Sequence, residues 1–185
     1  MSHFSKIKTN ITDIEALKQA LSNMGLTLES NAPCRYYYGK TMKENVCKLP
    51  GRYDVAFTPN ADGKSYYIDA DFYKGDVERS IGKKGSKLMR QYSIEKVKIE
   101  AKRQGFDVIV GKSNQIKIYD PTDSSGGYLE CSLSETGNLS IKAQGFVGSS
   151  CMKFQNLEEA LGSVSREYTE EYYEPMGQQF LTERY

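Results

Sequence analysis

Apolar residues recur with helical spacing in two segments of the chain. In residues 13–25 the spacing of three and four predicts an amphipathic helix, with Gly25 as its left-handed stop. Thr12 and Glu15 have the spacing of a capping box, so we expect the Thr12 hydroxyl to accept from the Glu15 amide. A second helical pattern covers residues 86–104 and ends at Gly105. Each helix has an apolar face that needs a sheet or another helix to cover it.

Alternating apolar and polar residues predict short strands around these helices. The clearest pair is a hairpin, in which residues 53–58 and 66–72 alternate on either side of the turn 59–63. The other predicted strands lie at residues 4–11, 26–28, 36–38, near 46, 106–110 and 116–118. This order predicts an α+β domain over residues 1–119, with a mainly antiparallel sheet and two helices on one of its faces.

Residues 120–127 have the composition of a linker or an exposed turn. Beyond them, strands at 128–133 and 139–143 and a helix that begins near Ser149 or Ser150 predict a small ββα unit. The second domain is therefore expected to span residues 128–185. A unit this small has a marginal core, so we expect it to dock on the larger domain or on a partner.

Opposite charges cancel between the two parts of the chain. Residues 1–119 carry 21 Lys and Arg against 13 Asp and Glu, a net +8, whereas residues 120–185 carry 4 against 11, a net −7. This asymmetry indicates either an acidic or nucleic-acid partner for the first part, or two parts that complement each other within a chain or between copies.

Cysteine usage and apolar runs bear on the compartment. No apolar run approaches the roughly 20 residues of a membrane-spanning helix, and the N-terminus lacks the apolar stretch of a signal peptide. The four cysteines, Cys34, Cys47, Cys131 and Cys151, form no Cys-x-x-Cys pair, which favours free thiols in a reducing compartment. We expect a protein of the cytoplasm or the plastid stroma that does not bind a membrane.

A Gly-x-x-Gly loop with lysines precedes the second helix. In KH domains such a loop lets a nucleic-acid backbone approach closely. The candidate nucleic-acid-binding residues are Gly82, Lys83, Lys84, Gly85 and Lys87. A KH loop joins two helices, however, and residues 73–77 do not have a firm helical pattern. The alternative is a solvated, lysine-rich entry to the long helix.

Other side chains have chemistry to offer, but a structural role is favoured for each. Asp54, Asp69 and Asp71 lie on adjacent predicted strands and have the oxygens for a divalent metal, yet such residues more often line the wet face of a sheet. Cys151 lies near a helix N-terminus, where a thiolate is favoured, but packing is the expected role. His3 is the only histidine. We therefore expect no catalytic residue, no metal and no cofactor.

The C-terminal stretch 165–185 is acidic and aromatic. Tyr168, Tyr172 and Tyr173 fall at i, i+4 and i+5, a spacing that would give a short helix an aromatic stripe. The stripe either fills a groove on a partner or covers the small unit of the same chain. These tyrosines are the candidate partner-binding residues.

Residues 1–119 resemble the hypothetical chloroplast reading frame thirty-five family, which is uncharacterised. The matching segments are Met1–Phe4, Ile7–Thr9, Asp13–Gly25, Tyr53–Val55, Gln91–Tyr92 and Glu100–Phe106. The remainder resembles a second small uncharacterised bacterial domain through Gly137, Gly145–Cys151 and Leu157–Gly162. Members of the two kinds often accompany AAA-type ATPases, so the resemblance implies an accessory role. It implies no catalytic residue.

The expected function is that of a non-enzymatic interaction protein, an adaptor or regulator associated with an AAA-type ATPase. The alternative is a nucleic-acid-binding protein that uses the basic Gly-x-x-Gly loop.

Overall fold

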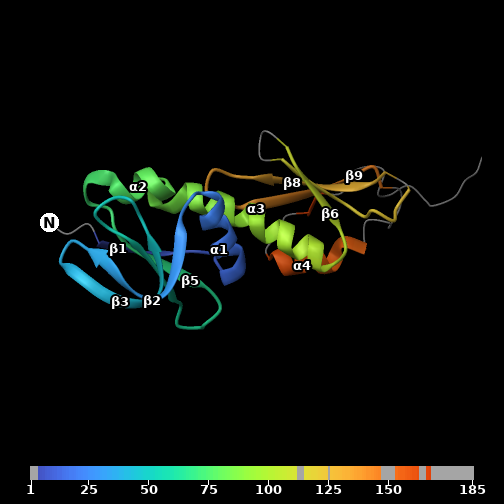
Figure 1. The fold of residues 1–185 in the computed structure, drawn as a ribbon. Coiled ribbons are helices and arrows are strands. Elements are labelled where there is room, and N and C mark those ends of the chain that lie inside the picture. Colours follow the sequence, from blue (N-terminus) through green and yellow to red (C-terminus); the bar gives the residue numbers. More distant parts are fainter. Residues whose placement is uncertain (1–3, 112–114, 125, 147–152, 163–165, 168–185) are drawn as a thin grey trace, which may run out of the picture. The chain divides into compact units, whose positions relative to one another are not determined.

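The computed structural model describes residues 4–111, 115–124, 126–146, 153–162 and 166–167 (Figure 1). The chain divides into two compact units. Unit 1 comprises Met1–Val97 and Leu133–Asn138, and unit 2 comprises Lys98–Ser132 and Leu139–Tyr185.

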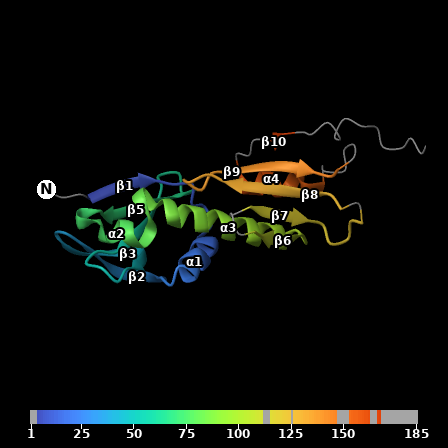
Figure 2. The same cartoon turned by 90° about the horizontal axis from the view of Figure 1, so that it is seen from above.

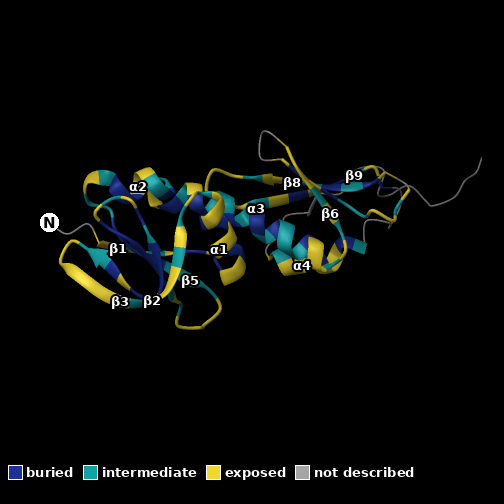
Figure 3. Cartoon of the chain, viewed as in Figure 1, coloured by how far each residue is buried: buried dark blue, intermediate teal, exposed yellow. Residues whose placement is uncertain are grey.

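Unit 1 contains a five-stranded sheet in which every neighbouring pair is antiparallel. Its strands, in the order β1-β5-β4-β3-β2, are β1 (Phe4–Lys8), β5 (Tyr66–Asp71), β4 (Val55–Pro59), β3 (Gly39–Lys48) and β2 (Thr27–Tyr36). The predicted hairpin is confirmed as β4 and β5, and Phe57 pairs with Ile68 in its register. β2 and β3 form a longer hairpin whose tip is exposed (Figure 3).

Two helices supply most of the buried helical side chains of unit 1. α1 spans Ile14–Asn23 and α3 spans Ser86–Arg103, so α3 runs on into unit 2. Leu88 of α3 is fully buried, and so are four side chains of α1: Ala16, Leu17, Ala20 and Leu21. On β4 and β5, the fully buried residues Val55, Phe57, Ile68 and Ala70 share one face, because they are paired in the register or lie two positions apart.

The start of α1 differs from the predicted capping box. Asp13, not Thr12, is the N-cap, and its carboxylate accepts from the amides of Glu15 (2.8 Å) and Ala16 (3.1 Å). The amides of Thr12 and Asp13 instead donate to the hydroxyl of Tyr92, at 2.9 Å and 3.1 Å. A buried tyrosine of α3 therefore fixes where the chain enters α1. Thr and Asp are both favoured N-cap residues, and the Tyr92 hydroxyl, which accepts from the Thr12 and Asp13 amides, holds the chain so that the helix starts after Asp13.

A short helix precedes the Gly-x-x-Gly loop. α2 spans Asp76–Ile81 and follows a 3₁₀ turn at Tyr73–Gly75, and a second 3₁₀ turn at Lys83–Gly85 leads into α3. Residues 73–77, which have no firm helical pattern, thus hold a 3₁₀ turn and the first residues of a short helix. Asp76 and Glu78 in the first turn of α2 are acidic, which favours a helix start, although the segment is too short to show a helical period.

Unit 2 contains a second five-stranded sheet (Figure 2). Its strands, in the order β10-β9-β8-β7-β6, are β10 (Arg166–Glu167), β9 (Leu139–Gln144), β8 (Tyr128–Leu133), β7 (Ile116–Tyr119) and β6 (Asp107–Val110). β6, β7 and β8 pair antiparallel, whereas β10 runs parallel to β9. The helix α4 (Gln155–Leu161) lies on one face of this sheet in both views (Figures 1 and 2).

The α+β class is confirmed, but residues 107–119 do not extend the first sheet. They form β6 and β7, and β7 pairs with β8 across the segment 120–127. The expected linker is thus a loop between two neighbouring strands of one sheet, and the ββα segment shares that sheet. Alternation along residues 106–118 shows that strands form but not which strands they pair with. No helix in the described part of the chain is long and apolar enough to cross a membrane.

Candidate functional site: a basic pocket

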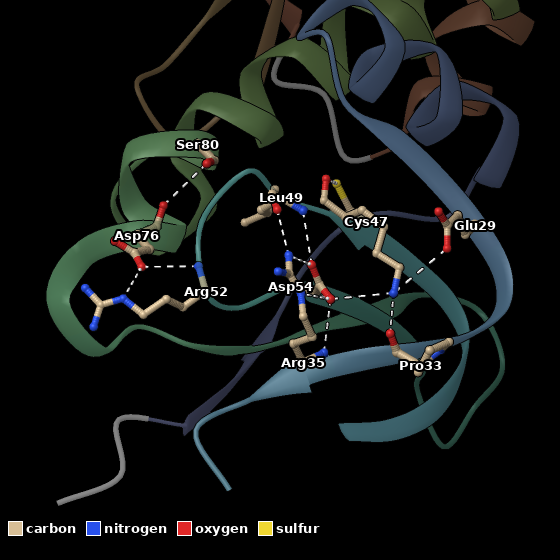
Figure 4. Close-up of polar contacts among 10 residues, drawn as sticks. Glu29, Pro33, Arg35, Cys47, Leu49, Arg52, Asp54, Asp76 and Ser80 are labelled. Atoms are coloured by element: carbon tan, nitrogen blue, oxygen red, sulfur yellow. Dashed lines mark hydrogen bonds and ion pairs between the residues drawn. The ribbon is translucent and has the colours of Figure 1, made fainter. Parts of the chain in front are cut away.

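A buried carboxylate organises the cations on one side of unit 1. Asp54 is fully buried and receives two hydrogen bonds from the Arg35 guanidinium, Nη2 to Oδ1 at 2.6 Å and Nε to Oδ2 at 2.9 Å (Figure 4). The backbone amides of Arg35 and Leu49 donate to the same carboxylate at 3.0 Å and 3.1 Å. A buried charge is costly unless it is paired and hydrogen-bonded, and Asp54 meets both conditions.

The same carboxylate holds Lys48 beside a surface pocket. Lys48 Nζ lies 3.6 Å from Asp54 Oδ2 and 3.9 Å from a Glu29 carboxylate oxygen, and it donates to the Pro33 carbonyl (Figure 4). On α2, Asp76 plays a similar part, since it pairs with Arg79 and lies 3.2 Å from Arg52 Nε. Lys48 and Arg79 are therefore fixed by acidic partners of their own chain.

Asp69 and Asp71 are also buried, so the expectation that these aspartates line a wet face is wrong. Asp69 accepts from Thr58 Oγ1 at 2.9 Å, and Asp71 accepts from the amides of Tyr37 (3.3 Å) and Tyr73 (3.1 Å). In the register Asp69 pairs with Ala56, and Ala56 pairs with Val46 in a small buried apolar cluster. Asp69 therefore shares its face of the sheet with a buried apolar cluster, and that face is not open to water. Among the described residues, no group of three or more acidic, histidine or cysteine side chains is placed to hold a metal ion.

The pKa of Asp54 follows from opposing effects. Burial alone would raise it, but the hydrogen bonds from Arg35 and from the two backbone amides prevail and lower the pKa below its ordinary value of 3.8. The same contact raises the pKa of Arg35. The pair is therefore ionised on both sides at neutral pH.

The described thiols are buried, and burial disfavours the thiolate. It raises the pKa of Cys34 to about 11 and the pKa values of Cys47 and Cys131 to about 12 each. These thiols are protonated at neutral pH and are poor nucleophiles and poor metal ligands. Cys151 and His3 lie outside the described residues.

A surface pocket of about 580 Å³ lies between the end of α1, the β2–β3 hairpin and α2. Three cationic side chains line it, Lys48, Arg79 and Lys87, against the single carboxylate of Glu29. Ser80 and the chain turn after α1, including Gly25, complete the lining. The excess of positive charge suits an anionic group.

The lysines of the loop differ from the other cations of this region. Lys83, Lys84 and Lys87 are exposed, and none of them pairs with a carboxylate in the described parts of the chain. Arg35, Lys43 and Lys48, by contrast, each have a buried acidic partner. The loop lysines therefore keep their charge available to another molecule, and Lys87 brings it to the pocket.

The two glycines of the loop have structural causes. Gly82 has a φ of +85°, and a Cβ there would lie 2.6 Å from the Lys87 nitrogen. Gly85 is buried and has a φ of +84°. A Cβ at this position would lie only 2.9 Å from Ile68 Cδ1, which is too close. The structure brings all five predicted loop residues together, but Gly85 faces the core of unit 1 rather than solvent.

Sequence reasoning missed Lys48, Arg79 and Glu29. They come from β3, α2 and β2, and no motif joins them, because the fold alone brings them to the pocket. Tyr168, Tyr172 and Tyr173 lie outside the described residues.

Fold and pocket together define an α+β protein with an unpaired basic loop beside a basic pocket. The model of the family described as Protein of unknown function (DUF1257) matches residues 20–117, and the chain belongs to this family. A second model, Protein of unknown function (DUF2997), matches residues 129–173. The resemblance inferred from the sequence is confirmed.

Two curated relatives are named as uncharacterised proteins. The chain is 31% identical to "Uncharacterized protein ycf35" of Pyropia yezoensis over 124 residues, 64% of this chain and 94% of the relative. It is 31% identical to the protein of the same name in Guillardia theta over 108 residues, 57% of this chain and 83% of the relative. No solved structure matches the chain.

The buried pair predicts a large and pH-dependent loss of stability. Asp54→Ala removes the partner of Arg35 and leaves two amides without their acceptor, so the free energy of unfolding at neutral pH should fall by about 3 kcal/mol. Because the folded pKa lies below 3.8, this contribution is present above that pH and is lost as the pH falls through the folded pKa. Chemical denaturation should therefore show the difference from the unmodified protein shrinking in acid.

Glu44→Ala is the matched control for this variant, because Glu44 is an exposed carboxylate on the neighbouring strand β3. Its effect should stay within about 0.5 kcal/mol. Equal losses for the two variants would contradict the role given to Asp54.

The raised thiol pKa values predict protection from alkylation. In the folded protein near neutral pH, Cys34, Cys47 and Cys131 should react with iodoacetamide far more slowly than in denaturant, because the thiolate is the reacting form. Peptide mapping by mass spectrometry reports each site separately. Fast labelling of any of the three in the folded state would show that its environment is not the one described.

Proposed function

We propose that the chain is a non-enzymatic interaction protein that binds an acidic surface of a partner through the lysines of the Gly82–Gly85 loop and the adjoining pocket. The observation that carries this proposal is that Lys83, Lys84 and Lys87 are exposed and lack acidic partners in the described residues. Unpaired surface charge steers and orients an oppositely charged partner. An AAA-type ATPase is the partner class that the family resemblance implies, and the chain acts as its adaptor or regulator.

The roles of the other reactive groups support binding rather than catalysis. The carboxylates of Asp54 and Asp76 serve to hold cations of the same chain. The thiols of Cys34, Cys47 and Cys131 are protonated at neutral pH. A general acid, base or nucleophile needs an accessible group with a pKa suited to its task. The two carboxylates are occupied by cations of the same chain, and the pKa values of the three thiols are too high.

A nucleic-acid backbone is the second candidate, and one observation favours it. The loop joins two helices, α2 and α3, as a KH-type loop does, and presents Lys83 and Lys84 to solvent. The burial of Gly85 against Ile68 counts against it, because that glycine then offers no open approach to a backbone. For this reason we prefer a protein partner.

The test reverses the charge of the loop. Lys83→Glu combined with Lys84→Glu should weaken binding to the partner ATPase on the order of tenfold, mainly through a slower association rate that depends on salt. The partner is first captured from the native host with the tagged chain and identified by mass spectrometry. The association rate is then measured with the purified partner at about 50 and 200 mM salt.

Lys40→Glu combined with Lys64→Glu makes the same change of net charge at two other exposed positions, one at the start of β3 and one in the turn before β5, and is the control. Equal rates for the two double variants would remove the loop from the interface. Salt-dependent binding of single-stranded RNA that only the loop variant loses, with no ATPase recovered, would favour the nucleic-acid candidate instead.

A further inference from the structure

The boundary between the two matched families falls inside one sheet. The first family model ends at residue 117, within β7, and the second begins at residue 129, within β8. β7 and β8 are neighbours in the sheet of unit 2 and pair antiparallel over four residue positions each. Two segments that evolve as separate families are therefore joined by backbone hydrogen bonds.

The strand pair is complementary on both faces of the sheet. On one face Ile116 pairs with Cys131 and Ile118 with Leu129, and all four are buried. On the other face Lys117 pairs with Glu130, and the Lys117 ammonium lies 4.4 Å from the ring centroid of Tyr128. Apolar and opposite-charge pairs across strands both stabilise a sheet.

Two further contacts join the same two segments. Phe106 precedes β6 and Phe154 precedes α4, and the centroids of their rings lie 4.5 Å apart. Phe154 is fully buried. In unit 1 the turn after β8 sits on α3, where Ser93 Oγ donates to the Gly137 carbonyl at 2.6 Å. A Cβ on Gly137 would lie 2.7 Å from the carbonyl of Met89, so only glycine fits there.

The loop between the strands is partly exposed, but it adds ion pairs to the second segment, since Lys153 Nζ lies 3.4 Å from Asp120 Oδ2 and also pairs with Asp123. Pro121, Thr122, Ser124 and Gly126 are exposed. The match to the relative from Pyropia yezoensis covers 94% of that protein but only 64% of this chain. The relative therefore has almost no residues left to form the second segment. In a chain of that length the β7 edge has no strand β8 of its own to pair with.

We propose that residues 1–119 and 128–185 are separate binding partners, which recognise each other by strand addition of β8 to β7, by Phe106 with Phe154, and by the Gly137 turn on α3. The loop 120–127 tethers them, and its Asp120 and Asp123 add ion pairs to Lys153 of the second segment. The β7 edge of a chain that ends near residue 119 is accordingly a docking site for a second chain of the type matched by residues 129–173. Strand addition of this kind obtains affinity from the backbone and specificity from the alternate side chains.

The experiment cuts the loop in the folded, full-length protein. A recognition sequence for a specific protease is inserted after Ser124, and the two ends of the chain carry different affinity tags. After cleavage, either tag should retain both fragments, and the pair should elute at the mass of the uncut protein. Separation of the fragments in native buffer would overturn the proposal.

Variants then locate the interface in the cut protein. Gly137→Val and Phe154→Ala should each raise the dissociation rate of the two fragments on the order of tenfold, because interface changes act mainly on dissociation. Glu135→Ala, an exposed position in the same turn as Gly137, is the control and should leave the rate unchanged. Circular dichroism of each uncut variant checks that it folds, and Phe154→Leu replaces Phe154→Ala if the latter does not.

Dissociation rates of both variants equal to that of the control would show that these contacts do not hold the fragments, and would overturn the proposed interface. The result is independent of the loop lysines, since neither variant touches residues 82–87.

Discussion

The fully buried charge of Asp54 is the constraint on which the basic side of unit 1 depends. A carboxylate without solvent must find donors, and Asp54 finds the Arg35 guanidinium and two backbone amides. Those contacts tie β2 to the segment between β3 and β4, and through Lys48 they also set one wall of the pocket. The position of one cation that lines the pocket therefore depends on a structural carboxylate.

Paired and unpaired cations divide the work in this region. Arg35, Lys48 and Arg79 hold acidic groups of the same chain and serve the fold. The loop lysines are exposed and have no acidic partner among the described residues. The 21 Lys and Arg of residues 1–119 thus overstate the cations that a partner meets, because several of them are paired with carboxylates of the same segment. The distinction matters because only unpaired charge steers an encounter.

The sequence predicted local structure well and long-range pairing poorly. The helix at 86–104 and the hairpin of β4 and β5 followed from periodicity, since both are contacts between near neighbours in the chain. Asp69 and Asp71 were misplaced because alternation cannot show that their face of the sheet also carries a buried apolar cluster. The pairing of β7 with β8 was missed because a linker-like composition at 120–127 also suits a loop within one sheet. The pocket combines residues of β2, β3, α2 and α3 with the turn after α1, and no short motif encodes it.

The loop between β7 and β8 has a consequence for how the chain is made. A free β7 edge on a newly synthesised protein would be a template for pairing with any other strand, and hence an aggregation hazard. A tether of a few residues supplies β8 at an effective concentration on the order of millimolar, whatever the amount of protein in the cell. Joining the two segments in one chain therefore guarantees equal numbers of both. It also shortens the time during which the β7 edge is unpaired.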